Sequence, residues 1–512
     1  MGRRALPWTG VVVAVGLAAL ILGTLAMVAW QAQGLGRLGP WDVRAVWFTL
    51  WQAALSATLS VLLAIPVARA LARRVFPGRD LLVLLMGAPF ILPVIVAVMG
   101  LVAVFGRRGL INSGLAELGL PAISIYGWQG VILAHVFFNL PLSVRLILQG
   151  WQAIPAERFR LASSLGFQPS EMARHLERPM LRAVAPGAWL AVFLVCLNSF
   201  AVALTLGGGP RATTVELAIY QAFRFDFDMG RAATLALVQV GLSVVAMALA
   251  ARVTLPTAFG AGFDRATPII APRGWRGWGD ALTIAAAGLF LLVPMAAIII
   301  PGVPGLISLS PSVWLSAARS IGMALTSTAL TLLMGLALSL ALAPGGRRWI
   351  EAAGMLPLVA SPLVLGTGIY LAVRGWVVPE TLALPVTVIV NAVMALPFAL
   401  RALIPAAKAV DDDFGRLSTS LGMTGWARLR WVTLPRMARP LGFAAGLAAA
   451  LSMGDLGVIT LFSGGERTTL PMQLFLLMGR YRMADAASAA VLLMAISFAL
   501  FWLFDKWGRR YA

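Results

Sequence analysis

Apolar stretches of about 20 residues recur from one end of this chain to the other, and few folds can accommodate them. A helix of that length crosses the hydrocarbon core of a bilayer, which is about 30 Å thick. Hydrophobic residues make up 60% of the 512 positions, and charged residues only 12%. A soluble globule cannot bury that much apolar surface. Because the short alternating segments of a β-barrel are absent from the sequence, we expect an all-α polytopic membrane protein.

The apolar pattern predicts twelve membrane spans. The first follows Arg3 and Arg4 and is longer than the apolar core of a typical signal peptide, so we expect it to remain uncleaved. The predicted spans are 8–30, 49–71, 82–105, 128–150, 184–206, 231–253, 280–301, 317–343, 352–374, 383–404, 441–462 and 486–505.

Positive charge is concentrated in alternate connections between these spans. The formal net charge is +20, and with the N-terminus inside, most of the 40 lysines and arginines fall in cytoplasmic segments. This distribution predicts that both termini are cytoplasmic. Nucleic-acid binding is not expected, since the arginines form no single tail or face. A segment rich in Gly and Pro, 256–279, is expected to be a cytoplasmic linker between a first half (1–255) and a second half (280–512).

Two predicted cytoplasmic segments repeat each other at a spacing of 256 residues. We name them the first repeat loop (152–182) and the second repeat loop (406–440). Ser164-Leu165-Gly166 matches Ser420-Leu421-Gly422, and Pro179 matches Pro435. Each loop is predicted to be a short helix, a glycine turn and a second helix stopped by proline. Such an element is compact enough to dock on another protein. Two amphipathic helices lying on the lipid surface are the alternative.

The repeat loops resemble the EAA loops of binding-protein-dependent ABC importer permeases, which reside in the bacterial inner membrane. The glycines, Leu176 and Val432 have the family's spacing, but Arg160 and Arg416 stand where its motif has glutamate. The resemblance implies two tandem six-helix halves, and loops that contact a cytoplasmic ATPase. The implied contact residues are Glu157, Arg160, Ala162, Gly166, Pro179, Asp413, Arg416, Ser418, Gly422 and Pro435.

Further segments, 206–233 and 452–482, are similar to the fused permeases of thiamine importers. This resemblance implies inward transport of thiamine, thiamine phosphate or thiamine pyrophosphate by alternating access. It also implies two copies of a separate ATPase, and a periplasmic binding protein that delivers substrate to the outer loops, including 207–230 and 464–482. Iron(III) and polyamine permeases share parts of these motifs, so those cargoes remain alternatives.

Several polar residues within or beside the predicted spans are candidates for the transport pathway. A carboxylate in a bilayer is costly unless it faces water or a partner. Asp455 is therefore a candidate pore residue, although it could instead lie at the outer interface or pair with an arginine. The outer-loop carboxylates could face a cationic ligand, remain solvated or contact the binding protein, whereas the remaining polar groups favour hydrogen bonds between helices. These other candidates are Asn198, Asp226 and Asp228 for the pathway or outer loops, and His135, Asn139 and Asn391 for interhelical bonds.

No residues for catalysis or cofactor binding can be identified in the sequence. The chain has only two lysines, Lys408 and Lys506, and neither lies in a Gly-x-x-x-x-Gly-Lys phosphate loop. Two histidines and one cysteine, Cys196, are too scattered to predict a metal site. We therefore expect a non-catalytic subunit without a cofactor. A gradient-driven secondary transporter and a membrane scaffold or insertase are the rival functions from other classes.

Overall fold

The described part of the chain is entirely helical in its regular structure. The computed structural model describes residues 7–32, 38–87, 91–207, 209–250, 252, 275–343, 348–462 and 468–511. Eleven helical segments of this part are long and apolar enough to span a membrane, or twelve if one bent pair counts as a span. The chain is thus an all-α polytopic membrane protein, as the apolar pattern predicted. Residues 256–274 of the predicted linker lie outside the described residues, and 275–279 already belong to a helix.

The bent pair corresponds to the ninth predicted span, which we expected to be one continuous helix at 352–374. Instead, α15 (Arg348–Met355) with the short turn η6 (Leu356–Leu358) meets α16 (Pro362–Val373) at an angle of 92°. Pro357 and Pro362 account for the break, because proline supplies no backbone donor and disfavours a helical residue before it. Ser361 starts α16 by accepting a hydrogen bond from the Val364 amide at 3.1 Å.

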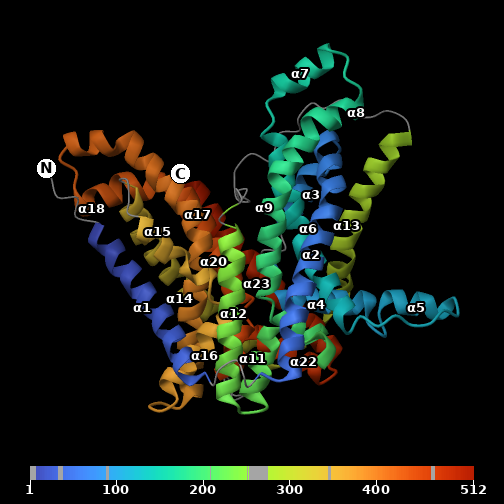
Figure 1. Cartoon of the computed structure of the whole chain (residues 1–512), viewed down its shortest axis with the longest axis vertical. Helices are drawn as coiled ribbons and strands as arrows, with labels where there is room; N and C mark the ends of the chain where they lie inside the picture. The colour runs from blue at the N-terminus through green and yellow to red at the C-terminus, as the bar shows by residue number, and fades with distance from the viewer. Residues whose placement is uncertain are drawn as a thin grey trace.

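The third predicted span, 82–105, is also interrupted. α3 (Arg79–Leu85) is short, and α4 (Val94–Phe105) begins separately after Pro93. Beyond α4, the short helix α5 (Leu110–Glu117) projects sideways from the bundle (Figure 1).

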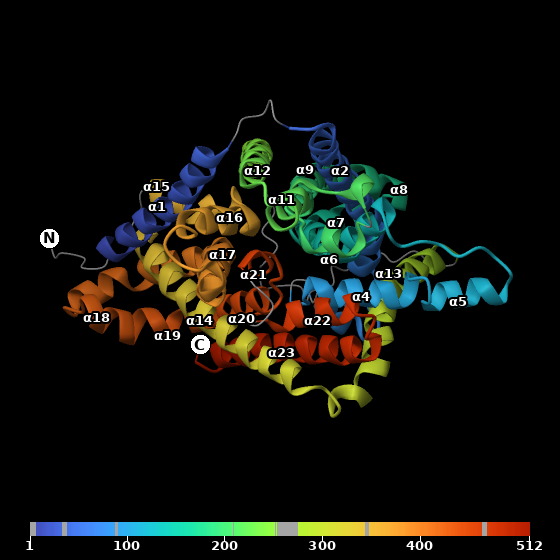
Figure 2. The same ribbon diagram turned by 90° about the horizontal axis from the view of Figure 1, so that it is seen from below.

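The order of helices in the first part of the chain recurs in the second. The bounds of the corresponding elements are α2 (Pro40–Arg73) and α14 (Pro311–Leu342), α6 (Trp128–Gln152) and α17 (Ala383–Ser420), α9 (Arg178–Leu197) and α20 (Ala438–Met453), α10 (Ala201–Leu206) and α21 (Gly457–Phe462), α11 (Val215–Arg224) and α22 (Leu470–Gly479), and α12 (Met229–Ala250) and α23 (Met483–Arg510). In the view from below, the two sets lie on either side of the centre of the molecule (Figure 2).

The first helix of each set packs largely against the other set. α1 (Pro7–Gln31) contacts α14 and α16 as well as α12, and α13 (Trp275–Gly302) contacts α4 and α2 as well as α23. The two largest buried apolar clusters therefore each combine helices from both parts of the sequence. This exchange could not be read from hydropathy, because an apolar helix has the same pattern whichever neighbour covers it.

Both repeat loops lie at one end of the bundle. α7 (Ala156–Ser164) and α18 (Gly425–Arg428) project at the top of Figure 1 on two separate arms, and α23 ends at the same side (Figure 1). α11, α16 and α22 lie toward the opposite end.

Candidate functional site

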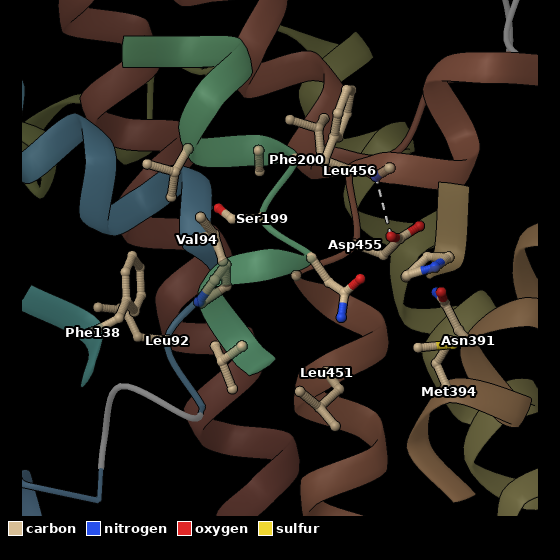
Figure 3. Close-up of a pocket in the computed structure, with 18 of the residues that line it drawn as sticks. Leu92, Val94, Phe138, Ser199, Phe200, Asn391, Met394, Leu451, Asp455 and Leu456 are labelled. Carbon is tan, nitrogen blue, oxygen red and sulfur yellow. Dashed lines mark hydrogen bonds between the residues drawn. The ribbon is translucent and has the colours of Figure 1, made fainter. Parts of the chain in front are cut away.

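A cavity of about 400 Å³ lies between the two sets of helices. Its lining comes from α4, α6, α9, α10 and α11 in the first part of the chain and from α16, α17, α20 and α21 in the second. In Figure 3, Leu92 and Phe138 lie on one side, with Asn391 and Met394 on the other (Figure 3). The polar residues that line it are His135, Asn139, Asn198, Ser199, Glu216, Asn391 and Asp455.

Many lining residues occur in pairs separated by the same 256 residues as the repeat loops. His135 pairs with Asn391 in this way, Phe138 with Met394, and Ser199 with Asp455. Corresponding positions of the two helix sets thus face one shared space.

Two breaks in the helices bring polar groups to the cavity. α9 ends at Leu197 and α10 begins at Ala201; α20 ends at Met453 and α21 begins at Gly457. These breaks lie 256 residues apart. Non-helical backbone at membrane depth is tolerated only where protein buries it or water reaches it, and both breaks line this cavity. We had expected continuous helices at 184–206 and 441–462.

Asp455 lies in the second break and lines the cavity, where we predicted a pore residue. Its Oδ1 accepts a hydrogen bond from the Gly457 amide at 3.1 Å, which caps the start of α21 (Figure 3). Its Oδ2 is buried without a hydrogen-bond partner. The ion pairs of the described residues include none to Asp455, so the alternative of pairing with an arginine is not what the structure contains.

Glu216 is a second carboxylate in the cavity lining, and sequence reasoning missed it. It lies in the first turn of α11, is only 1% exposed, and leaves Oε1 buried without a partner. The sequence signal that could have indicated Glu216 is its acidic side chain in the otherwise apolar run Val215–Ile219. This run begins directly after the capping residue Thr214.

The neutral polar groups are held by hydrogen bonds between helices, as the sequence indicated. His135 contacts Ser199 at 2.7 Å and Ser56 at 3.4 Å. Asn391 on α17 donates to Ser452 on α20 at 3.1 Å. Asn198 accepts from Gln239 on α12 at 2.9 Å. These bonds fix the positions of the cavity walls.

Asp226 and Asp228 lie outside the cavity, at the start of α12. Asp226 pairs with Arg231 at 2.6 Å, and Asp228 accepts a hydrogen bond from the Arg231 amide at 2.9 Å. Arg231 also pairs with buried Asp42 on α2 at 2.7 Å. Asp42 therefore ties α2 to α12 through the Arg231 guanidinium, which Asp226 shares, whereas Asp228 accepts from the backbone at the start of α12. A contact of Asp226 or Asp228 with a ligand or binding protein stays a prediction.

Both repeat loops contain the glycine turn that the sequence predicted. Gly166 and Gly422 have φ of 70° and 66°, a left-handed conformation that glycine adopts without steric cost. The Phe167 amide donates to the Ala162 carbonyl at 3.0 Å, and the Met423 amide donates to the Ser418 carbonyl at 2.9 Å. This is the hydrogen-bond pattern of the Schellman motif, repeated at the 256-residue spacing.

The predicted proline stops are wrong. The π-helical turn η3 (Ala173–Glu177) precedes Pro179, and the π-helical turn η8 (Leu429–Thr433) precedes Pro435. Proline lacks an N–H and crowds the carbonyl four residues earlier, so the wider turn lets the helix continue. In the first repeat loop, the helix that contains Pro179 continues into α9. In the second repeat loop, the helix that contains Pro435 is interrupted at Met437, before α20.

The first helix of the second repeat loop is not a separate short helix, contrary to our expectation. α17 continues from the membrane to Ser420, whereas α7 follows a break after α6. Pro155 starts α7, and Asp411 occupies the corresponding position of α17. An aspartate permits the helix to continue, and Asp411 also pairs with Arg428 across the loop at 2.6 Å.

The predicted contact residues fall at matching places on the two loops. Ala162 and Ser418 are buried. The others, apart from the two glycines, are exposed side chains: Glu157, Arg160, Pro179, Asp413, Arg416 and Pro435. Sequence reasoning did not single out two pairs of exposed leucines that also match at this spacing. Leu161, Leu165, Leu417 and Leu421 are 60%, 64%, 54% and 66% exposed. We name these four residues the leucine pairs.

Comparison with known proteins shows similarity along nearly the whole chain. The thiamine transport system permease protein ThiP of Salmonella typhimurium is 38% identical, covering 97% of this chain and 96% of that protein. The protein of the same name from Brucella abortus is also 38% identical, covering 96% and 93%. The one from Haemophilus influenzae is 33% identical, covering 89% and 86%. No family model matches the chain.

Proposed function

Because the chain belongs to the family of thiamine transport system permease proteins, we propose that it is the permease of an ABC importer that carries thiamine or its phosphate esters into the cell. It would act without catalytic residues of its own, and two copies of a separate ATPase would hydrolyse ATP. The proposed location is the bacterial inner membrane, with both termini and both repeat loops in the cytoplasm.

The observation that carries this proposal is the pair of matched docking elements at one end of the bundle. Both repeat loops have the same glycine turn, the same π-helical turn and the same exposed leucine positions. Two copies of one ATPase require two equivalent surfaces, and the leucine pairs supply an apolar centre for each contact. Surface-bound amphipathic helices would not need the same turn twice.

The mechanism that we propose is alternating access about the cavity. ATP-driven closure of the two ATPases would draw the repeat loops together, and the two sets of helices would rock as bodies around the space between them. A periplasmic binding protein would deliver the substrate at the opposite end, near α11 and α22. The outer segment 464–482 is proposed as part of that contact; its residues 464–467 lie outside the described residues.

The docking role is tested by giving the leucine pairs a charge. Leu165→Asp combined with Leu421→Asp should reduce recovery of the ATPase with the purified chain at least tenfold, because each buried contact would contain an unpaired carboxylate. Co-purification from detergent-solubilised membranes measures this. The exposed control Leu118→Asp directly follows α5, which projects sideways from the bundle, apart from both repeat loops, and should leave recovery unchanged. Full recovery in the double variant would contradict docking through these loops.

A further inference from the structure

The cavity has an unusual charge for a protein of net charge +20. Among the described residues that line it, two are carboxylates, Glu216 and Asp455, and none is an arginine or lysine. Each carboxylate has one buried oxygen without a hydrogen-bond partner. An unpaired carboxylate in an apolar environment is costly unless a cation or a hydrogen-bond donor meets it. The cavity is therefore suited to a positively charged ligand.

We propose that this cavity is a binding site for an organic cation, in which Glu216 and Asp455 hold the positive ring of the transported molecule. The inference rests on the proposed function and adds to it, since it makes the permease, and not only the binding protein, selective for charge. The thiazolium ring of thiamine has a permanent positive charge and no N–H to donate. A carboxylate can therefore attract it through charge, without a hydrogen bond to the ring nitrogen.

The repeat provides an internal argument that these carboxylates are not required for the fold. The residue equivalent to Asp455 in the first set is Ser199. Counted from the threonine that precedes each short helix, Thr214 or Thr469, the residue equivalent to Glu216 in the second set is Pro471. The same helix break and the same threonine before the short helix form in both sets. Each carboxylate therefore occurs in only one of the two sets, whereas the equivalent backbone in the other set forms with a different residue at that position.

The remaining lining suits a flat cationic ligand. A volume of about 400 Å³ falls within the range of small-molecule sites. Phe138, Phe200 and Phe398 supply aromatic faces, which attract cations through the ring quadrupole. Asn198 and Asn391 supply amide groups for the polar substituents of such a ligand.

The test measures binding to the permease without its binding protein. The chain and its ATPase, assembled in lipid nanodiscs, are titrated with radiolabelled thiamine and with its uncharged thiophene analogue. The wild type should prefer thiamine. Asp455→Ser, which places the first set's residue at this position, and Glu216→Gln should each weaken thiamine binding about tenfold and leave binding of the analogue unchanged. The exposed control Asp80→Asn should bind both compounds as the wild type does.

Three results would overturn the site: no detectable thiamine binding by the wild type, equal binding of thiamine and the neutral analogue, or unchanged thiamine binding in both variants. Gel filtration of each variant confirms that it is folded. The same nanodiscs also report ATP hydrolysis with the thiamine-loaded binding protein. Stimulated hydrolysis without charge-dependent binding would overturn the site alone, whereas a wild type that is not stimulated would overturn the proposed importer.

Discussion

Replacing both loop glycines with valine, Gly166→Val with Gly422→Val, should abolish thiamine uptake while the chain still inserts into the membrane. Both glycines have φ near +70°, and a β-branched residue is a steric outlier there. The strain would unwind both Schellman turns, so that the helices on either side of each turn no longer hold the geometry needed for docking. We expect a loss of uptake of at least about 100-fold, since coupling needs both loops to be positioned. Uptake into proteoliposomes containing the complete importer measures it.

Gly166→Asn with Gly422→Asn is the matched control, because asparagine tolerates the left-handed conformation better than other residues with a side chain. A Cβ at either position meets no atom within 4 Å, so side-chain size alone should not disturb the fold. Uptake by the asparagine variant should remain within a few-fold of the wild type. If the valine variant transported as well as the asparagine variant, the glycine turns would have no role in coupling.

Removing the buried carboxylate at the start of α2, by Asp42→Ala, should destabilise the protein strongly. Asp42 is 2% exposed. Its two carboxylate oxygens share the Arg231 Nε–H, and it also accepts hydrogen bonds from the Arg231 Nη2 and from the Gly39 amide at the start of α2. Its loss would leave Arg231 with only Asp226 and would remove a helix cap. We expect a decrease of about 2–4 kcal/mol in the free energy of unfolding, measured as a fall in the thermal midpoint in detergent.

The second carboxylate on the same arginine provides the comparison. Asp226 is 48% exposed, and its pair with Arg231 is open to solvent screening, so Asp226→Ala should cost less than about 1 kcal/mol. Asp42 and Asp226 thus pair with the same cation, Arg231, and differ in how far they are buried. Equal shifts of the midpoint in the two variants would show that Asp42 does not tie α2 to α12 as the structure indicates.

Sequence reasoning was most successful where a physical constraint acts locally. The apolar runs predicted the membrane helices because hydrocarbon demands about 20 apolar residues for each span. The repeated Gly166 and Gly422 predicted their turns, since few residues other than glycine adopt a left-handed helix end. The cost of a charge within a bilayer singled out Asp455, which lines the cavity, and its role in transport stays a prediction.

Features that depend on distant neighbours were not accessible in this way. Glu216 was missed because its place in the cavity lining depends on helices that are distant in the sequence, including those of the second set. Pro179 and Pro435 predict helix ends, but a π-helical turn precedes each of them, and proline alone does not reveal whether a wider turn will accommodate it. The exchange of α1 and α13 between the two sets likewise depends on packing, and the apolar pattern of a helix does not specify its neighbours.

We propose that delivery of ligand to this chain is coupled to ATP hydrolysis on its ATPase partner. The most direct measurement is ATP hydrolysis by the chain reconstituted with its ATPase, with and without a thiamine-loaded binding protein. We expect the loaded binding protein to stimulate hydrolysis several-fold more than the empty one, and uptake to stop when ATP is removed. Hydrolysis indifferent to the loaded binding protein, together with uptake that persists on an ion gradient without ATP, would contradict it and favour a secondary transporter.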